Sequence, residues 1–318
     1  MFLFIDWQPS IEAFHIGSFG VRWYSLCWVI GLLGAYLIVR QLYADQRIDP
    51  EIRNEKKVYT QRFDPLFLYC FIGVILGARL GHCLFYEPSY YLSSAKHIIE
   101  MFLPIRFDPD SWDWRVIGYT GLASHGGATG LFIGLLLYMR SKKVPFWVLM
   151  DNIGIAAPFT SFCIRIGNLM NSEIIGTTTD QPWGFIFHTN EALQNGQLVA
   201  RHPSQLYEAI AYLIIFIIIV LIYRQSRKAY QGKENKLYQV REWISVGTGF
   251  YFGLCLASIF LFRFFIEFLK EVQGGADDGS TLLDMGQILS IPFILIGLWS
   301  MFRKFQIFKK KSFLIPNS

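Results

Sequence analysis

The chain has 318 residues, of which 53% are hydrophobic and only 17% are charged, and its formal net charge is +5 at pH 7. A chain of this length would ordinarily form two soluble domains, but its long apolar runs exclude that organisation. The positive charge does not indicate a nucleic-acid-binding protein either, because the basic residues gather in a few connecting segments.

Seven apolar runs are each long enough to cross a bilayer as one helix, which needs about 20 mostly apolar residues. We therefore predict an all-α, polytopic membrane protein with seven transmembrane helices, in which residues 1–318 form one integral-membrane domain. The predicted spans are 21–43, 63–86, 121–139, 144–170, 205–223, 243–269 and 284–302.

Charge alternates between the segments that connect these spans. The segments 87–120 and 171–204 are rich in acidic residues, and we predict that they form outer loops. Cytoplasmic loops of membrane proteins carry the excess of lysine and arginine, so the N-terminus is predicted to lie outside and the C-terminus in the cytoplasm. The basic, cytoplasmic segments would then be 44–62, 140–143, 224–242 and the tail 303–318.

The five cysteines all fall within predicted spans, and none forms a Cys-x-x-Cys pair. We interpret them as small buried apolar residues and predict neither a disulfide framework nor a metal site. The sequence gives no reason to expect a cofactor. The cysteines are Cys27, Cys70, Cys83, Cys163 and Cys255.

The first two predicted spans carry few polar side chains. Tyr24 lies at the start of the first, where an aromatic belt is expected at the membrane interface. In the second, Gly73, Gly77 and Gly81 recur every four residues and predict a small-residue face that allows a close helix neighbour. Arg79 lies near the outer end of the same span, from which its side chain could reach the headgroup layer.

The third predicted span begins with Ser124-His125-Gly126-Gly127. A histidine that faces a helix bundle is commonly a hydrogen-bonded structural residue, but the neighbouring glycines leave the His125 ring accessible. From this segment alone, a structural and a functional role both stay open.

The fourth span ends in the least expected stretch of the chain, where Arg165, Asn168 and Glu173 follow a long apolar segment. A charged side chain at the bilayer centre costs about 2.5–3.5 kcal/mol on insertion scales, so a charged residue in such a position is usually functional. These three residues are therefore the first candidates for a site.

The fifth and sixth spans add further polar residues. The octet 201–208 could be a solvated helix start, but Gln205 and Glu208 lie one turn inside the span. In the sixth span, Arg263 and Glu267 are four residues apart, so they share a helix face and could form an ion pair with a purely structural role.

These polar residues are predicted to lie at one depth. Arg79, Arg165 and Arg263 all occur near the outer ends of spans that run outward. A transporter would instead place polar groups and broken helices near the midplane. The outer ends of the remaining spans carry Tyr24, His125, Gln205, Glu208 and Gln287.

Such a cluster is suited to chemistry on a phospholipid headgroup. Guanidinium groups bind phosphate oxygens in a bidentate manner, and a nearby histidine can accept a proton from an incoming nucleophile. The sequence has neither a Gly-x-Ser-x-Gly elbow nor a zinc-ligand spacing. We infer a metal-free displacement at a phospholipid, with a non-catalytic anionic-phospholipid transporter or binding protein as the alternative.

The same segments resemble one family, the bacterial prolipoprotein diacylglyceryl transferases. The resemblance covers nearly the whole chain in collinear order, and its most specific pieces are Arg-Ile-Gly-Asn at 165–168 and Arg-His-Pro-Ser-Gln-Leu-Tyr-Glu at 201–208. Other matching pieces lie at 22–24, 77–81, 124–127, 171–176, 182–184, 262–267 and 285–290.

The resemblance implies a multi-pass enzyme of the bacterial inner membrane whose active site faces the outer leaflet and the periplasm. It would transfer the diacylglyceryl group of phosphatidylglycerol to the thiol of the lipobox cysteine of a prolipoprotein, the first step of lipoprotein maturation. A thioether and glycerol phosphate would be the products. The implied partners are phosphatidylglycerol, prolipoprotein signal peptides and membrane lipids, without nucleic acid, metal or cofactor.

The resemblance also implies residue roles. Arg165 and Arg263 would hold the phosphate and stabilise the leaving group, and together with Asn168 and His125 they form the predicted catalytic set. His125 would help to deprotonate the substrate thiol, either as a base or as a positioning group, since a free thiol is mostly protonated at neutral pH. Predicted substrate contacts are Arg165, Tyr24, Glu173, Gly176, Arg79, Glu267, Gln205 and Glu208.

Three positions depart from the family's usual pattern. Lys270 stands where an arginine is common, Ile259 where a tyrosine is common, and Thr177 where an arginine is frequent. Lysine keeps the charge but lacks the bidentate fork. We therefore expect these departures, including Lys270, to affect peripheral contacts and not the central set.

Overall fold

The computed structural model describes residues 4–17, 19–46, 56–103, 105–108, 110–116, 123–230, 243–271 and 283–312. The chain divides into two compact units. The first contains Met1–Val39 and Phe146–Ser318, and the second contains Arg40–Pro145.

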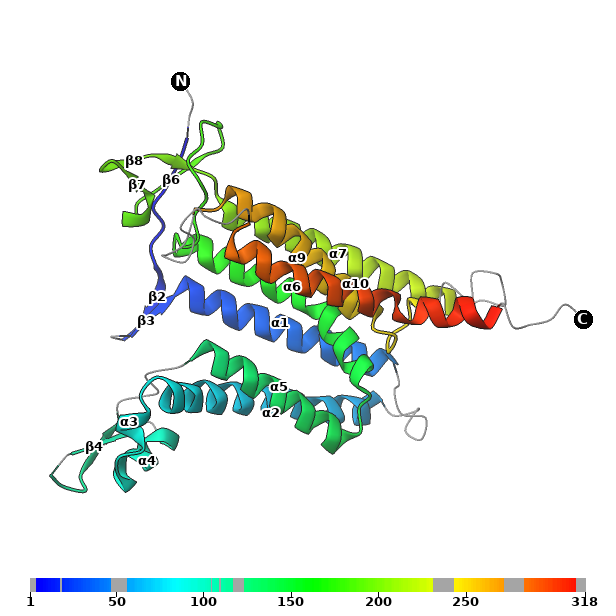
Figure 1. The fold of residues 1–318 in the computed structure, drawn as a ribbon, viewed down its shortest axis with the longest axis horizontal. Helices are drawn as coiled ribbons and strands as arrows, with labels where there is room; N and C mark the ends of the chain where they lie inside the picture. The colour runs from blue at the N-terminus through cyan, green and yellow to red at the C-terminus, as the bar shows by residue number, and fades with distance from the viewer. Residues whose placement is uncertain are drawn as a thin grey trace, which may run out of the picture. The chain divides into compact units, whose positions relative to one another are not determined.

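The first unit is built on long helices. Helices α6, α7, α9 and α10 run side by side (Figure 1), with α6 packed on α7 and α9, and α9 packed on α10. Helix α1 belongs to this unit over most of its length. The bounds are α1 Trp23–Gln46, α6 Phe146–Met170, α7 Ser204–Tyr230, α9 Phe250–Ile266 and α10 Met285–Ser312, with a 3₁₀ turn η3 at Glu267–Leu269.

Short strands join the connecting segments of this unit. Strand β1 (Ile5–Trp7) pairs in parallel with β6 (Phe185–Phe187), which pairs antiparallel with β9 (Ala200–Arg201). The Trp7 Nε1 donates a hydrogen bond to the Leu169 carbonyl at 3.0 Å and so ties this sheet to the end of α6. Further elements are the hairpins β2 (Glu12–Ile16) with β3 (Phe19–Arg22) and β7 (Leu193–Gln194) with β8 (Gln197–Leu198), and the turn η2 (Asn190–Ala192).

The second unit is a helix pair with a small segment of short helices and strands between its two helices. Helix α2 (Lys56–Phe85) packs along α5 (Ser124–Lys142), as Figure 1 shows. The predicted small-residue face is confirmed, because a Cβ added at Gly77 would lie 2.4 Å from the carbonyl oxygen of Gly126. The segment between these helices forms α3 (Pro88–Tyr91), α4 (Ala95–Phe102), β4 (Ile105–Phe107) and β5 (Trp114–Val116).

Six described helices are long and apolar enough to cross a membrane, so the prediction of a mostly helical membrane protein is confirmed. The predicted third span forms helix α5 but is not among the six. The sixth predicted span begins at Phe250 and not at 243, because the chain adopts positive φ at Gly247 and Gly249. The six are Trp23–Tyr43, Phe63–Phe85, Phe146–Met170, Ser204–Ser226, Phe250–Leu269 and Met285–Lys304.

Candidate active site

The first unit brings many of the predicted site residues together where α6 ends, α7 begins and α9 passes into η3. We call this group the polar cluster. It consists of Arg165, Asn168, Glu173, Glu208, Glu267 and Lys270, which contact one another directly or through a shared partner.

Arg165 is held from two sides. Its Nε lies 3.1 Å from Glu208 Oε2, and its Nη1 donates to Asn168 Oδ1 at 3.3 Å. The Glu208 side chain is 0% exposed and that of Arg165 is 11% exposed. A buried carboxylate without a partner would be strongly destabilising, so this ion pair fixes the guanidinium at the end of α6.

The chain after α6 folds back onto the cluster. Asn168 Nδ2 donates to Glu173 Oε2 at 3.2 Å, and the Gln205 side chain donates to the Glu173 carbonyl oxygen. Ser172 and Ile174 both adopt positive φ, which is costly for residues with a Cβ and for a β-branched residue above all. Backbone strain of this kind is typical of functional sites.

Lys270 belongs to the centre of the cluster, so the expectation that it would be peripheral is wrong. Its Nζ lies 3.3 Å from Glu208 Oε1 and 3.1 Å from Glu267 Oε2, and its side chain is buried. The Tyr212 hydroxyl donates to Glu208 Oε1 at 3.1 Å. The Glu208 carboxylate therefore interacts with three side chains, those of Arg165, Lys270 and Tyr212.

The ion pair that the spacing of Arg263 and Glu267 allowed is not formed among the described residues, where Glu267 pairs with Lys270. Helix α9 ends at Ile266, and Glu267 begins a 3₁₀ turn. The Glu267 N–H still donates to the Arg263 carbonyl oxygen. Its side chain, however, lies 3.1 Å from Lys270 Nζ, three residues further along the chain.

Arg263 has no anionic partner among the residues that the structure describes. Its side chain is half-buried, and within the described ranges it forms no salt bridge. It lies in the same region as the cluster, because the neighbouring Phe262 ring stands 6.4 Å from the ring of Tyr212. The arrangement leaves one guanidinium with capacity for an external anion.

Gly176 shapes the cluster through its backbone. Its N–H donates to the His202 carbonyl oxygen at 2.9 Å, and an added Cβ would lie only 2.5 Å from that oxygen. Arg201 is buried and donates to the carbonyl oxygens of Gly176 and Ala192, so the octet 201–208 is not a solvated helix start. Burial lowers the pKa of His202 from its ordinary value of 6.5.

Two further predicted residues lie on other helices of the same unit, Tyr24 on α1 and Gln287 on α10. A Cβ on Gly167 would lie 3.0 Å from Tyr24 Cδ2, which places the tyrosine ring against α6 one residue before Asn168. Gln287 is buried and donates to the Phe264 carbonyl oxygen at 3.2 Å, so it fixes the start of α10 against the end of α9.

Two predicted residues belong to the second unit. Arg79 is buried, donates from Nη2 to the Glu100 carbonyl oxygen at 2.8 Å, and stacks on the ring of Tyr91. These contacts hold the segment between α2 and α5 in place. His125 is exposed in the first turn of α5. Its proximity to Arg165 stays a prediction.

Together with Arg263, the polar cluster contains three cationic and three anionic side chains. The cationic residues are Arg165, Arg263 and Lys270, and the anionic residues are Glu173, Glu208 and Glu267. The sequence motifs predicted most of these residues. Tyr212 was missed, although its position four residues after Glu208 is the spacing at which helix neighbours meet.

Comparisons with known proteins identify the family to which this chain is similar. A family model described as prolipoprotein diacylglyceryl transferase matches residues 11–303. A protein of Bacteroides fragilis named phosphatidylglycerol–prolipoprotein diacylglyceryl transferase is 46% identical over 302 residues, covering 95% of this chain and 96% of its own length. Proteins of the same name from Tolumonas auensis and Porphyromonas gingivalis are each 34% identical, and each alignment covers at least 92% of this chain and 94% of the relative.

Proposed function

The chain belongs to the prolipoprotein diacylglyceryl transferase family, and on that premise we propose that it transfers the diacylglyceryl group of phosphatidylglycerol to the thiol of a prolipoprotein's lipobox cysteine. The sulfur forms a bond to the glycerol carbon that carries the phosphate ester. The bond between that carbon and the ester oxygen breaks, and glycerol phosphate leaves. This reaction is the first step of bacterial lipoprotein maturation.

The observation that carries the proposal is the unequal state of the two arginines. Arg165 is fixed by Glu208 and Asn168, whereas Arg263 has no protein anion among the described residues. A phosphate of the lipid supplies that anion, and both guanidinium groups stabilise the negative charge that grows on the departing glycerol phosphate. Lys270 supports the arrangement by sharing the charge of Glu208.

His125 completes the proposed site as the group that takes or orients the proton of the substrate thiol. It is exposed on α5 and therefore accessible to a substrate. Tyr24, Glu173 and Gly176 shape the substrate pocket in this proposal.

We also propose that α5 is the seventh span. A Cβ on Gly81 would contact Gly126, and one on Gly134 would contact Tyr69, so α5 packs antiparallel along most of the candidate span Phe63–Phe85. With seven spans, the basic connecting segments place the N-terminus outside and the C-terminus in the cytoplasm. The whole chain then forms one domain of the inner membrane, with its active site toward the outer leaflet.

The test is transfer from labelled phosphatidylglycerol to a lipobox peptide by the full-length protein in lipid vesicles. We expect wild-type transfer, a loss of about 100-fold or more in Arg263→Gln, and normal transfer in Arg140→Gln, which replaces an exposed arginine in the last turn of α5. A well-folded wild-type protein that binds the lipid but never modifies the thiol would contradict the reaction and favour a lipid-binding protein.

A further inference from the structure

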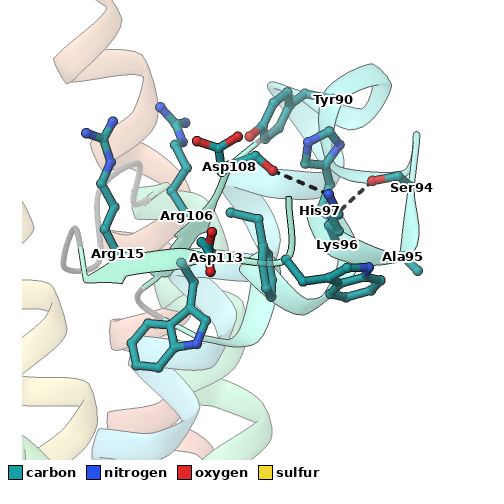
Figure 2. A pocket seen from close by; sticks show the side chains of 12 residues that line it. Tyr90, Ser94, Ala95, Lys96, His97, Arg106, Asp108, Asp113 and Arg115 are labelled. Atoms are coloured by element: carbon teal, nitrogen blue, oxygen red, sulfur yellow. Dashed lines mark hydrogen bonds between the residues drawn. The ribbon is translucent and has the colours of Figure 1, made fainter. Parts of the chain in front are cut away.

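The segment between α2 and α5 carries a pair of arginines outside the polar cluster. In the hairpin of β4 and β5, Arg106 lies directly opposite Arg115 in antiparallel register. Figure 2 shows both side chains extending in the same direction from the hairpin. Directly opposed residues have Cβ atoms about 4.5–5.5 Å apart, and like charges in that arrangement are destabilising.

No carboxylate of the described chain offsets this repulsion. Both arginines are exposed, and neither forms a salt bridge with any residue in the described ranges. The Arg106 Cζ lies 5.7 Å from the centroid of the Tyr90 ring. That contact uses the face of the guanidinium and leaves the N–H groups at its edge available to a ligand.

The other cationic groups around the same pocket are already engaged. Lys96 Nζ donates to the carbonyl oxygens of Ser111 at 2.8 Å and Asp108 at 3.3 Å. His97 Nδ1 lies 2.7 Å from Ser93 Oγ. The arginine pair is therefore the positive charge of this segment that an external group can use.

The nearby carboxylates are engaged as well. Glu100 is buried and accepts hydrogen bonds from the Tyr90 hydroxyl and the Phe107 N–H. The carboxylates of Asp108 and Asp113 accept hydrogen bonds from groups in the turn that joins the two strands. They stabilise the turn and do not pair with the arginines.

The pair lines an open pocket of about 1060 Å³ together with two exposed tryptophans. Trp112 is 64% exposed and Trp114 is 61% exposed. Tryptophans of this kind are enriched where a membrane meets water. The segment follows directly after the candidate span Phe63–Phe85, so a membrane around that span would bring its headgroup layer to this pocket.

We propose that Arg106 and Arg115 form a docking site for the phosphate group of an anionic phospholipid. Two adjacent guanidinium groups present paired N–H donors to the phosphate oxygens, and the bound anion removes the repulsion between them. The site holds a lipid without transforming it. It rests on the proposed membrane orientation and not on the transferase reaction.

The experiment is native mass spectrometry of the full-length protein released from detergent micelles. The protein is titrated separately with phosphatidylglycerol, phosphatidylcholine and inorganic phosphate. The variant is Arg106→Gln with Arg115→Gln, and the matched control is Arg140→Gln with Lys142→Gln, which removes two charges at the end of α5. Charge-assisted hydrogen bonds contribute about 1.5–3 kcal/mol, so we expect one phosphatidylglycerol site to weaken about tenfold or more in the variant and not in the control.

Two further measurements separate this site from misfolding and from the reaction. Without lipid, the double variant should unfold at the same temperature as the wild type or higher, because the repulsion is gone. Its transfer rate at saturating phosphatidylglycerol should be that of the wild type. If the double variant does not fold, Arg115→Gln alone carries the test. Unchanged phosphatidylglycerol affinity, equal affinity for phosphatidylcholine, or inorganic phosphate binding as tightly as the lipid overturns the proposal.

Discussion

Helix α6 holds two charged side chains, one in its first half and one near its end, and the protein stabilises them differently. Asp151 is fully buried and accepts backbone N–H groups from Gly247 at 2.8 Å, Gly249 at 2.9 Å and Phe252 at 3.0 Å. Arg165 instead contacts the side chains of Glu208 on α7 and of Asn168 on its own helix. Both of these side chains also bind other residues of the cluster.

The difference separates a structural polar site, at Asp151, from the proposed reactive site at Arg165. The first N–H groups of a helix have no partner within the helix. Asp151 accepts one of these from Phe252 of α9 and two more from Gly247 and Gly249 just before it, so backbone groups hold the carboxylate in place. The cluster around Arg165 is built from side chains of both charges. Next to it, Arg263 has no anionic partner within the described part of the chain.

The largest expected effect is on stability, at Asp151. Asp151→Ala leaves three backbone N–H groups, two just before α9 and one in its first turn, without an acceptor, and each such loss costs about 1–3 kcal/mol. We expect unfolding in detergent to require about 3–5 kcal/mol less free energy than in wild type. Asp64→Ala, at an exposed acid on α2, is the control. Unchanged stability would contradict the structural role of Asp151. So would a lower transfer rate in the protein that stays folded.

The next effect is on the reaction, at Arg165. Arg165→Gln should lower the transfer rate about 100-fold to 1000-fold, the range for removal of one transition-state hydrogen-bond donor. Stability should fall less than in Asp151→Ala, because Glu208 keeps Lys270 and Tyr212 as partners. Initial rates and unfolding curves of the same preparation test both parts. A variant that unfolds readily but transfers normally when folded would assign Arg165 a structural role.

A smaller effect on the transfer rate is expected at Lys270. Two substitutions there distinguish the role of the positive charge from that of the side-chain shape. Lys270→Met leaves the buried Glu208 with fewer partners, and we expect transfer to fall about tenfold. Lys270→Arg restores the residue common in the family and should retain wild-type transfer. The result that would remove Lys270 from the site is equal activity in Lys270→Met and wild type.

Much of the helical architecture could be predicted from local sequence. A long apolar run specifies a span wherever it occurs, and glycines at 73, 77 and 81 predicted a close neighbour without identifying it. The pairing of β1 with β6 could not be predicted, because it joins residues about 180 positions apart through backbone hydrogen bonds. No local pattern encodes such a partner.

Local sequence also failed to identify some of the partners within the site. Motifs identified Arg165, Asn168, Glu173 and Glu208, and the fold brings them together. The spacing of Arg263 and Glu267 allowed an ion pair, but Glu267 contacts Lys270 instead. The central place of Lys270 could not be predicted, because it depends on contacts with Glu208, 62 residues away in the sequence.

The smallest expected effect lies at the edge of the cluster, where His202 contacts Gly176 through its carbonyl oxygen but directs its ring to Tyr207. Burial lowers the pKa of His202 below 6.5 in the folded protein. Between the two pKa values the unfolded chain binds more protons, so stability is complete above about pH 6.5 and declines as the pH falls further. His202→Gln should flatten this decline in unfolding temperature between about pH 7 and 5 and leave transfer at pH 7 unchanged. If transfer at pH 7 falls instead, the imidazole acts in the reaction, and the boundary between the reactive cluster and its supporting segments lies beyond His202.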